Sequence, residues 1–306
     1  MNSTASVPLT EALPWPSPPP SDGRFFLVCD SIETDGRFLL HTLASQVLSS
    51  QDCTVLWVAC GPWTDQLIVA ALKKMGCDKA TTSRLHVRSV SVDMSTRILE
   101  ENNDNFNVEL YVEELYHSIS SWIMTNGGGG GNWIVIDDVS SLATLVGERL
   151  TYCFLLSLRA LAKRNMSYSI IMKCWHDFDI LREQDTTSIR AGGSRRHVDW
   201  VGAGGGRRSE GFGQHDHDDN VPWELTLPEL ADGIVNVEPL PSGYSREAHG
   251  RLVFVSQGRG WGQPNGKILQ TQGTPNELIP LVMNFCWQDT YVSAIRLRRP
   301  VAKELI

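Results

Sequence analysis

The chain has 306 residues, of which 42% are hydrophobic and 20% charged, a balance that supports a packed core and excludes disorder throughout. Its formal net charge of −8 gives no overall attraction to nucleic acid, so an RNA contact requires a local basic cluster or a partner chain. No apolar run reaches the roughly 20 residues of a membrane helix, and the first residues lack the pattern of a secretory signal, so we expect a soluble intracellular protein.

The seven cysteines are odd in number, and none is spaced as C-x-x-C. Cys29, Cys60 and Cys174 lie in apolar, strand-like runs. This pattern predicts reduced core residues rather than a disulfide framework.

The first predicted elements are a strand, a polar turn and a helix. Residues 1–22 are rich in proline, which favours extended chain, and we predict that they lie outside the fold. Residues 25–29 form a fully apolar strand candidate, and residues 31–37 form a polar turn. Residues 38–48 then carry apolar side chains at helical spacing.

Strands and helices alternate along the next part of the chain. Apolar runs predict strands at 55–60, 133–136 and 169–174, and alternation of apolar and polar residues predicts a strand at 85–90. Helical spacing predicts helices at 63–75, 108–124 and 150–161. Gly76 follows the first of these helices, where a left-handed cap is expected. Strands separated by helices predict an α/β fold with a mostly parallel sheet and helices on both faces.

The composition changes in the second half. Residues 182–222 are dominated by Gly, Arg, His and Asp and predict a mobile insertion. Residues 233–237 and 251–255 are strand candidates close enough to pair antiparallel and to extend one edge of the sheet. We therefore expect one domain over residues 23–300 that carries the insertion.

The turn between the first strand and helix has the position of a phosphate loop, where backbone N–H groups and a helix N-terminus bind an anion. The working pattern is Gly, four residues, then Gly-Lys-Ser/Thr. Aligned on Gly36, this chain has Ser31 for the first glycine, Arg37 for the lysine and Phe38 for the hydroxyl that holds magnesium. The side chains predict a degenerate phosphate loop.

A second interpretation of the same turn stays open. Thr34, Asp35 and Gly36 also suit a plain helix-capping turn. Both interpretations predict that nucleotide hydrolysis is lost.

Two carboxylates follow the strand at 133–136. Asp137 and Asp138 stand where P-loop proteins hold magnesium and position water, the Walker B position. Such acids also cap the helix that follows, so we expect a degenerate site with a structural role for Asp137. The spacing of about 100 residues from the first motif suits the RecA-like arrangement of the two loops.

The histidines indicate no catalytic or metal site. We expect His41 to be a hydrogen-bonded packing residue on the inner face of the first helix. His215 and His217 alternate with aspartates, but a glycine-flanked polar tract rarely supplies the outer contacts of a specific metal site. We predict no metal, no cofactor and no catalytic residue.

Clusters of arginine are the candidates for contact with nucleic-acid phosphates, which gives a salt-sensitive affinity that does not depend on base sequence. The clusters are Arg195, Arg196, Arg207, Arg208, Arg296, Arg298 and Arg299. A solubilising role for the same residues stays open.

Three segments, taken in order and spacing, resemble the family of Elongator complex protein 6, the sixth subunit of the Elongator complex. They are residues 28–30 with 34–41, residues 136–142, and residues 230–232 with 238–243 and 249–252. The resemblance covers about residues 25–258 apart from the insertion.

This resemblance implies a RecA-like fold without a conventional phosphate loop. It implies assembly with Elongator subunits four and five into a heterohexameric ring, a dimer of heterotrimers, in the cytoplasm and also in the nucleus. The ring binds tRNA and serves wobble-uridine (U34) modification by the catalytic Elongator subcomplex. Asp35, Gly36 and Arg37 match the family's altered loop, and Asp137 and Asp138 match its strand-end acids. No catalytic residue is carried over, and we expect no membrane contact.

Three hypotheses follow for function. The first is a non-catalytic ring subunit that packs against homologous neighbours. The second is an active or trans-acting ATPase subunit, in which Arg37 acts on a nucleotide bound by a neighbour. The third is a direct RNA-binding module that uses the arginine clusters.

Overall fold

A computed structural model describes most of the predicted domain. The described residues are 7–9, 13, 19, 21–31, 33–100, 106–126, 131–175, 223–240, 248–256, 281–287 and 292–296. The predicted insertion at 182–222 lies outside them.

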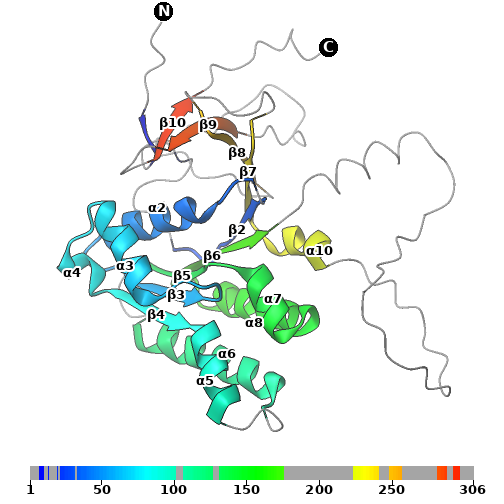
Figure 1. Cartoon of the computed structure of the whole chain (residues 1–306). Coiled ribbons are helices and arrows are strands. Elements are labelled where there is room, and N and C mark those ends of the chain that lie inside the picture. The colour runs from blue at the N-terminus through cyan, green and yellow to red at the C-terminus, as the bar shows by residue number, and fades with distance from the viewer. Residues whose placement is uncertain are drawn as a thin grey trace, which may run out of the picture.

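A twisted ten-stranded sheet forms the centre of the molecule (Figure 1). Its parallel strands are β2 (Phe25–Asp30), β3 (Val55–Ala59), β4 (Leu85–Ser89), β5 (Asn132–Ile136), β6 (Tyr168–Trp175) and β7 (Gly233–Glu238). The antiparallel strands are β8 (Gly250–Ser256), β9 (Leu281–Trp287), β10 (Val292–Arg296) and β1 (Val7–Pro8). The strand order is β1-β10-β9-β8-β7-β2-β6-β5-β3-β4.

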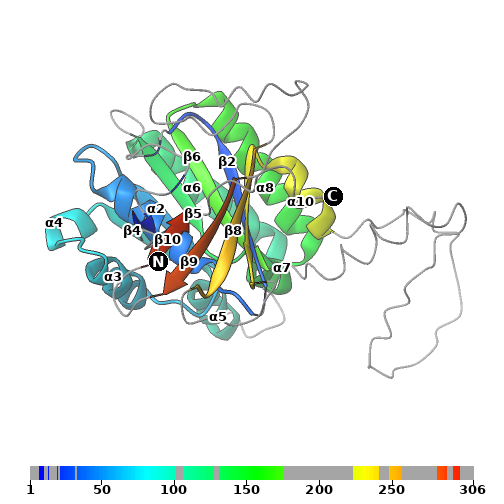
Figure 2. The same ribbon diagram turned by 90° about the horizontal axis from the view of Figure 1, so that it is seen from above.

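Helices cover both faces of the parallel part (Figure 2). On one face lie α2 (Arg37–Leu48) and α3 (Asp65–Lys74), followed by the short α4 (Lys79–Thr82). On the other lie α5 (Val90–Glu100), α6 (Val108–Asn126), α7 (Val139–Val146), α8 (Glu148–Arg164) and α10 (Trp223–Leu230). The central strands are buried on both sides, which is why they are almost continuously apolar.

The predicted α/β architecture is confirmed. Each predicted strand end lies within one residue of the observed end, because each run is either mostly apolar or alternates in polarity and is bounded by polar turns. The antiparallel pair is present as β7 and β8. Helices α4, α5, α7 and α10 and strands β9, β10 and β1 were not predicted.

The prediction that residues 1–22 lie outside the fold is wrong for the described part of that segment. Val7 and Pro8 pair with β10, and Leu9 and Leu13 are buried in the core beside α2. The proline content pointed to extended, unpacked chain, but a strand at the edge of a sheet tolerates Pro8 because one side of it needs no hydrogen bond.

No helix among the described residues is both long and apolar enough to cross a lipid bilayer.

Candidate functional site

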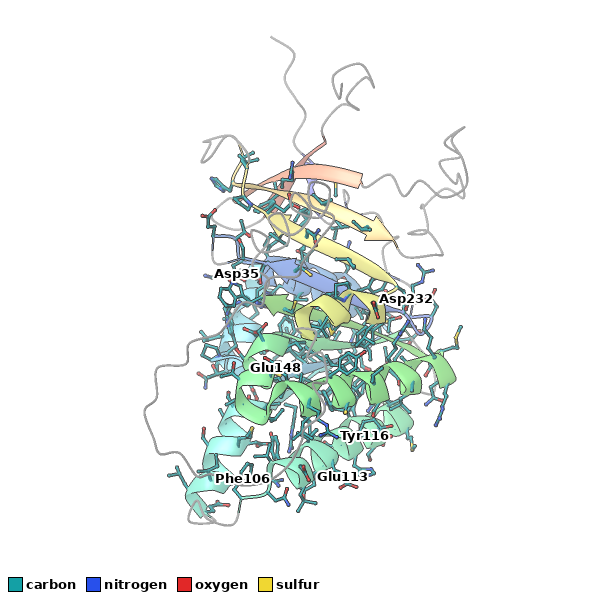
Figure 3. The ribbon with its side chains drawn as sticks, turned by 90° about the vertical axis from the view of Figure 1, so that its right-hand side faces the viewer. Asp35, Phe106, Glu113, Tyr116, Glu148 and Asp232 are labelled. Carbon is teal, nitrogen blue, oxygen red and sulfur yellow. The ribbon has the colours of Figure 1, made fainter. Side chains whose placement is uncertain are left out.

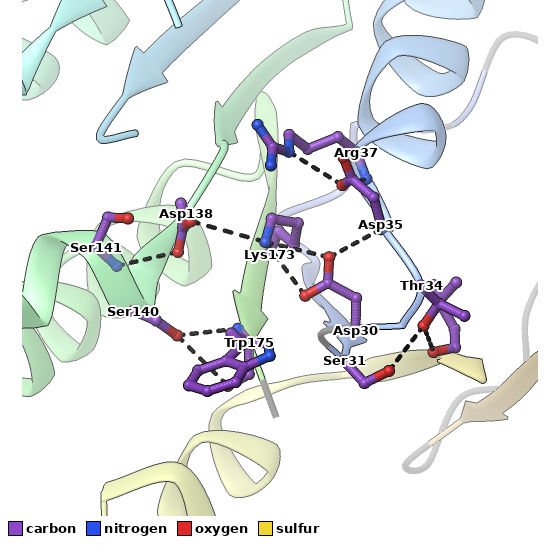
Figure 4. Close-up of polar contacts among 12 residues, drawn as sticks. Asp30, Ser31, Thr34, Asp35, Arg37, Asp138, Ser140, Ser141, Lys173 and Trp175 are labelled. Carbon is purple, nitrogen blue, oxygen red and sulfur yellow. Dashed lines mark hydrogen bonds and ion pairs between the residues drawn. The ribbon is translucent and has the colours of Figure 1, made fainter. Parts of the chain in front are cut away.

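The candidate site lies where the parallel strands end. Strand β6 lies between β2 and β5, so the two predicted loops are separated by one strand. Because the carboxyl ends of parallel strands lie at the same side of a sheet, the acid that ends β2 and the acids that follow β5 come close to the end of β6. The residue that joins them is Lys173 of β6 (Figure 4).

A buried ion pair forms the centre of this edge. Asp30, the last residue of β2, is 3% exposed, and Lys173 is also 3% exposed. The Lys173 Nζ lies 3.2 Å from both carboxylate oxygens of Asp30 and 3.8 Å from Oδ2 of Asp138. One buried cation therefore links the end of β2 to the start of α7.

The carboxylate of Asp30 also meets the start of helix α2. The Gly36 N–H donates a hydrogen bond of 2.8 Å to Asp30 Oδ2. A helix N-terminus attracts anions, and in a working phosphate loop that anion is a phosphate. Here the anion belongs to the chain itself.

Burial dominates the electrostatics of Asp30. Burial raises the pKa of this carboxyl above its usual value, while Lys173 and the Gly36 N–H act in the opposite direction. The ion pair thus offsets part of the cost of removing the carboxylate from water.

Gly36 is required by packing rather than by backbone conformation. Its φ of −78° is ordinary for any residue. A Cβ atom at this position would lie 2.9 Å from Val28 Cγ1 and 3.2 Å from Val237 Cγ2. The glycine therefore lets the turn lie directly against β2 and β7, which leaves no room beneath it.

The turn before α2 is tied to strand β7. The Thr34 hydroxyl donates a 2.7 Å hydrogen bond to the backbone carbonyl of Val237. Ser31 Oγ lies 3.1 Å from Thr34 Oγ1, and a backbone bridge joins the two residues. Both hydroxyls are engaged in holding the turn.

Asp35 and Arg37 form a local pair at the surface. Arg37 Nε donates to Asp35 Oδ1 at 3.0 Å, and the guanidinium lies 5.1 Å from the ring centroid of Trp63. The side chain of Arg37 is 29% exposed. The guanidinium of Arg37 therefore interacts with Asp35 and Trp63 of the same chain.

The two strand-end acids bind backbone groups. Asp137 is 1% exposed, and its Oδ1 accepts hydrogen bonds from the N–H groups of Cys60 (2.7 Å) and Gly61 (3.3 Å). Burial raises the pKa of Asp137, against these hydrogen bonds. Asp138 Oδ1 accepts from the Ser141 N–H at 3.0 Å and caps α7. Both side chains hold the ends of neighbouring elements in place.

Comparisons with known proteins give a relationship in fold. No family model and no curated protein matches the chain. Among solved structures, a KaiC-like protein from the hyperthermophilic archaeon Pyrococcus horikoshii OT3 superimposes with a TM-score of 0.50 and 10% sequence identity over 89% of each chain. The fold is RecA-like. At this identity the likeness concerns the fold alone.

In this RecA-like fold, only some of the residues predicted from the motifs lie close together. The turn at 31–37 and the acids at 137–138 lie on either side of β6 at one edge. Arg296 is the last residue of β10, and the other six arginines proposed for tRNA contact lie outside the described residues.

Sequence reasoning assigned no role to Lys173 and none to Asp30. The signal was present, since Lys173 is the single charged residue in the strand YSIIMKCW. A lysine in a strand buried on both faces requires an anionic partner. Its partner is 143 residues away in the chain, so the sequence alone did not show which acid it is.

Within the described part of the chain, no group of three or more His, Cys, Asp or Glu side chains is arranged to hold a metal ion.

Proposed function

We propose that this chain is a non-catalytic structural subunit of the Elongator complex. In this role it forms part of a RecA-like heterohexameric ring with Elongator subunits four and five. The resemblance of three sequence segments to Elongator complex protein 6 supports the identity, and the RecA-like fold agrees with it.

One observation carries the non-catalytic part of the proposal. The Asp30 carboxylate accepts the Gly36 N–H and pairs with Lys173, so the position of a nucleotide phosphate holds an internal anion. A bound phosphate would have to compete with this carboxylate for the Gly36 N–H and for the Lys173 ammonium, which disfavours phosphate binding. Phe38 also replaces the hydroxyl that holds magnesium.

The ring role explains why the fold is kept without its chemistry. Helices cover both faces of the parallel sheet and are available for packing against neighbouring subunits, while Asp30 and Lys173 occupy the phosphate-loop position. The ring binds tRNA and supports wobble-uridine modification by the catalytic subcomplex, in the cytoplasm and the nucleus.

Co-expression with Elongator subunits four and five tests the proposal. Native mass spectrometry is expected to give a 2:2:2 assembly, and calorimetry of the isolated chain with magnesium-ATP is expected to give no heat of binding at micromolar concentrations. A chain that stays monomeric beside both partners contradicts the proposal. Tight magnesium-ATP binding contradicts its non-catalytic part.

A second candidate is a role for Arg37 on a neighbour's nucleotide. Its guanidinium is partly exposed at the edge of the site and is held by Asp35 and Trp63, as a preorganised arginine would be. Under this alternative, Arg37→Ala lowers ATP turnover by the reconstituted ring, and unchanged turnover eliminates it. The RNA-binding hypothesis rests on arginines outside the described residues and stays a prediction, which crosslinking to tRNA would test.

A further inference from the structure

Two cysteines lie side by side on neighbouring strands at the carboxyl edge of the sheet. Cys29 of β2 is the register partner of Cys174 of β6. Both belong to the hydrophobic core that includes residues of α7, α8 and α10. Figure 3 shows this side of the sheet, with Glu148 labelled at the start of α8 and Asp232 just after α10. No other two of the described cysteines are register partners.

The spacing of the strands brings these two thiols within reach of a covalent bond. Neighbouring strands lie about 4.8 Å apart, and a disulfide joins Cα atoms that are about 4.4–6.8 Å apart. Side chains of register partners in parallel strands point to the same face of the sheet. The thiols of Cys29 and Cys174 already share a side-chain hydrogen bond. A disulfide between them therefore needs little movement of the backbone.

Both thiols are protected in the folded chain. Cys29 is 4% exposed and Cys174 is 1% exposed. The hydrogen bond with Cys29 and burial raise the pKa of Cys174 well above its usual value, while the charge of Lys173 acts in the opposite direction. Because the thiolate is the reactive form of cysteine, oxidation requires local opening of this part of the sheet.

The end of β6 is the place where such an opening can begin. Trp175 follows Cys174 directly, ends β6 and is 49% exposed. Strand β5 ends opposite Met172, so Trp175 lies beyond the part of β6 that β5 covers. The Trp175 N–H instead donates a 2.9 Å hydrogen bond to Oγ of Ser140 on α7 (Figure 4). This hydrogen bond fastens the strand end beside the two thiols.

We propose that Cys29 and Cys174 are a reversible redox pair, which a small peroxide oxidises to a disulfide. In this pair the hydrogen bond between Trp175 and Ser140 restrains the end of β6 and so limits how often the thiols meet the oxidant. The inference concerns a single chain and does not depend on the proposed ring.

The oxidation takes place in two steps. One thiol loses its proton, its sulfur attacks an oxygen of hydrogen peroxide, and the O–O bond breaks to give a sulfenic acid and hydroxide, which takes up that proton as water. The second thiol attacks the sulfenic sulfur, so that the S–S bond forms and the S–O bond breaks. Its proton leaves with the hydroxide as a second water. Two thiols and one peroxide thus give one disulfide and two waters, and a dithiol reductant reverses the reaction by exchange.

The disulfide joins the two strands that carry the buried ion pair. Cys29 directly precedes Asp30, and Cys174 directly follows Lys173. The bond also closes a long loop of the chain, which stabilises a fold mainly by restricting the unfolded state. Oxidation is therefore expected to raise the Tm of the chain by about 5 °C or more.

Peroxide treatment of the full chain tests the redox pair. Cys153→Ser is the background, because Cys153 is an exposed thiol that would react first. After hydrogen peroxide, alkylation of the denatured chain is expected to label two fewer thiols, and a peptide map is expected to join Cys29 to Cys174. Dithiothreitol is expected to restore both thiols. Cys29→Ala is expected to abolish the link, whereas Cys60→Ala, at another buried cysteine, is expected to retain it. Circular dichroism checks that each variant folds.

A serine variant tests the restraint on the strand end. Ser140→Ala removes the hydrogen bond to Trp175 and is expected to speed disulfide formation about threefold or more. Ser157→Ala, at an exposed position on α8, is the matched control and is expected to react at the wild-type rate. If peroxide gives no link between Cys29 and Cys174, or gives only sulfinic acid at these positions, the redox pair is wrong. Equal rates in Ser140→Ala and the wild-type chain overturn the role of Ser140.

Discussion

At the scale of single residues, His41 shows how the helix beside the candidate site is packed. Its Nδ1 lies 3.0 Å from the carbonyl oxygen of Arg37, and its ring contacts Trp57 and Trp63 at centroid distances of 4.9 and 5.6 Å. Burial lowers the pKa of His41 from 6.5 to about 4. The side chain is therefore neutral in the folded protein at physiological pH, as expected for a packing residue and not for a base.

This neutral histidine makes stability depend on pH. The unfolded chain binds a proton at His41 below about pH 6.5 and the folded chain only below about pH 4, so the contribution is complete above 6.5 and is lost as pH falls toward 4. The full loss is about 3 kcal/mol. His41→Phe is expected to flatten the urea-unfolding free energy between pH 6.5 and 4. His117→Gln, at an exposed position, is expected to leave the slope unchanged, and an unchanged slope in His41→Phe would contradict the assignment.

At the scale of elements, the start of α2 is fixed to two strands by one charge cluster. Asp30 ends β2, Lys173 belongs to β6, and Asp138 begins α7. The other end of α2 is held by Arg84, which donates to the carbonyl oxygens of Leu48, Ser50 and Cys53. A cation at a helix C-terminus is favourable for the macrodipole.

Substitution of Lys173 tests how the cluster holds these elements. Lys173→Met leaves Asp30 buried without its cation and is expected to lower the free energy of unfolding by about 3–5 kcal/mol. The double variant Asp30→Asn/Lys173→Met removes both charges and retains an oxygen for the Gly36 N–H, so most of the loss is expected to be recovered. Lys163→Met removes a more exposed pair with Asp232 and is expected to cost under about 1 kcal/mol. If the single and the double variant lose the same free energy of unfolding, this account is wrong.

At the scale of the whole molecule, the parallel and antiparallel parts of the sheet form one body. They join at β7, which pairs in parallel with β2 and antiparallel with β8. Asp232, just before β7, links this strand to β2 and α8. Its Oδ2 accepts a hydrogen bond from the Phe25 N–H at 2.9 Å, and its carboxylate pairs with Lys163 of α8 at 2.9 Å.

Gly250 tests whether both parts unfold together. A Cβ atom there would lie 2.8 Å from the backbone oxygen of Glu238 and 2.5 Å from Phe285 Cζ, so Gly250→Ala overpacks β7, β8 and β9. The expected loss is about 1–3 kcal/mol in one cooperative transition seen by both tryptophan fluorescence and circular dichroism. Gly61→Ala, whose nearest atom lies at 3.9 Å, is the control. Two separate transitions would indicate that the antiparallel part is an independent unit.

The sequence by itself determined strands β2 to β8, four of the eight helices among the described residues and the loss of the phosphate-loop side chains. Local hydrophobic periodicity carries this information, because a strand such as β2 or β5 is apolar along its whole length. Helix α7 was not predicted because it is short. Strands β9 and β10 were not predicted because they follow a long polar stretch of the sequence.

Only the tertiary structure decided what fills the site. Asp30 and Lys173 meet because β2 and β6 are neighbours in the sheet, although 143 residues separate them in the chain. The pairing of β5 with β6 likewise places Asp138 within 3.8 Å of Lys173. Strand order is set by packing between distant segments, and local sequence patterns hold no record of it.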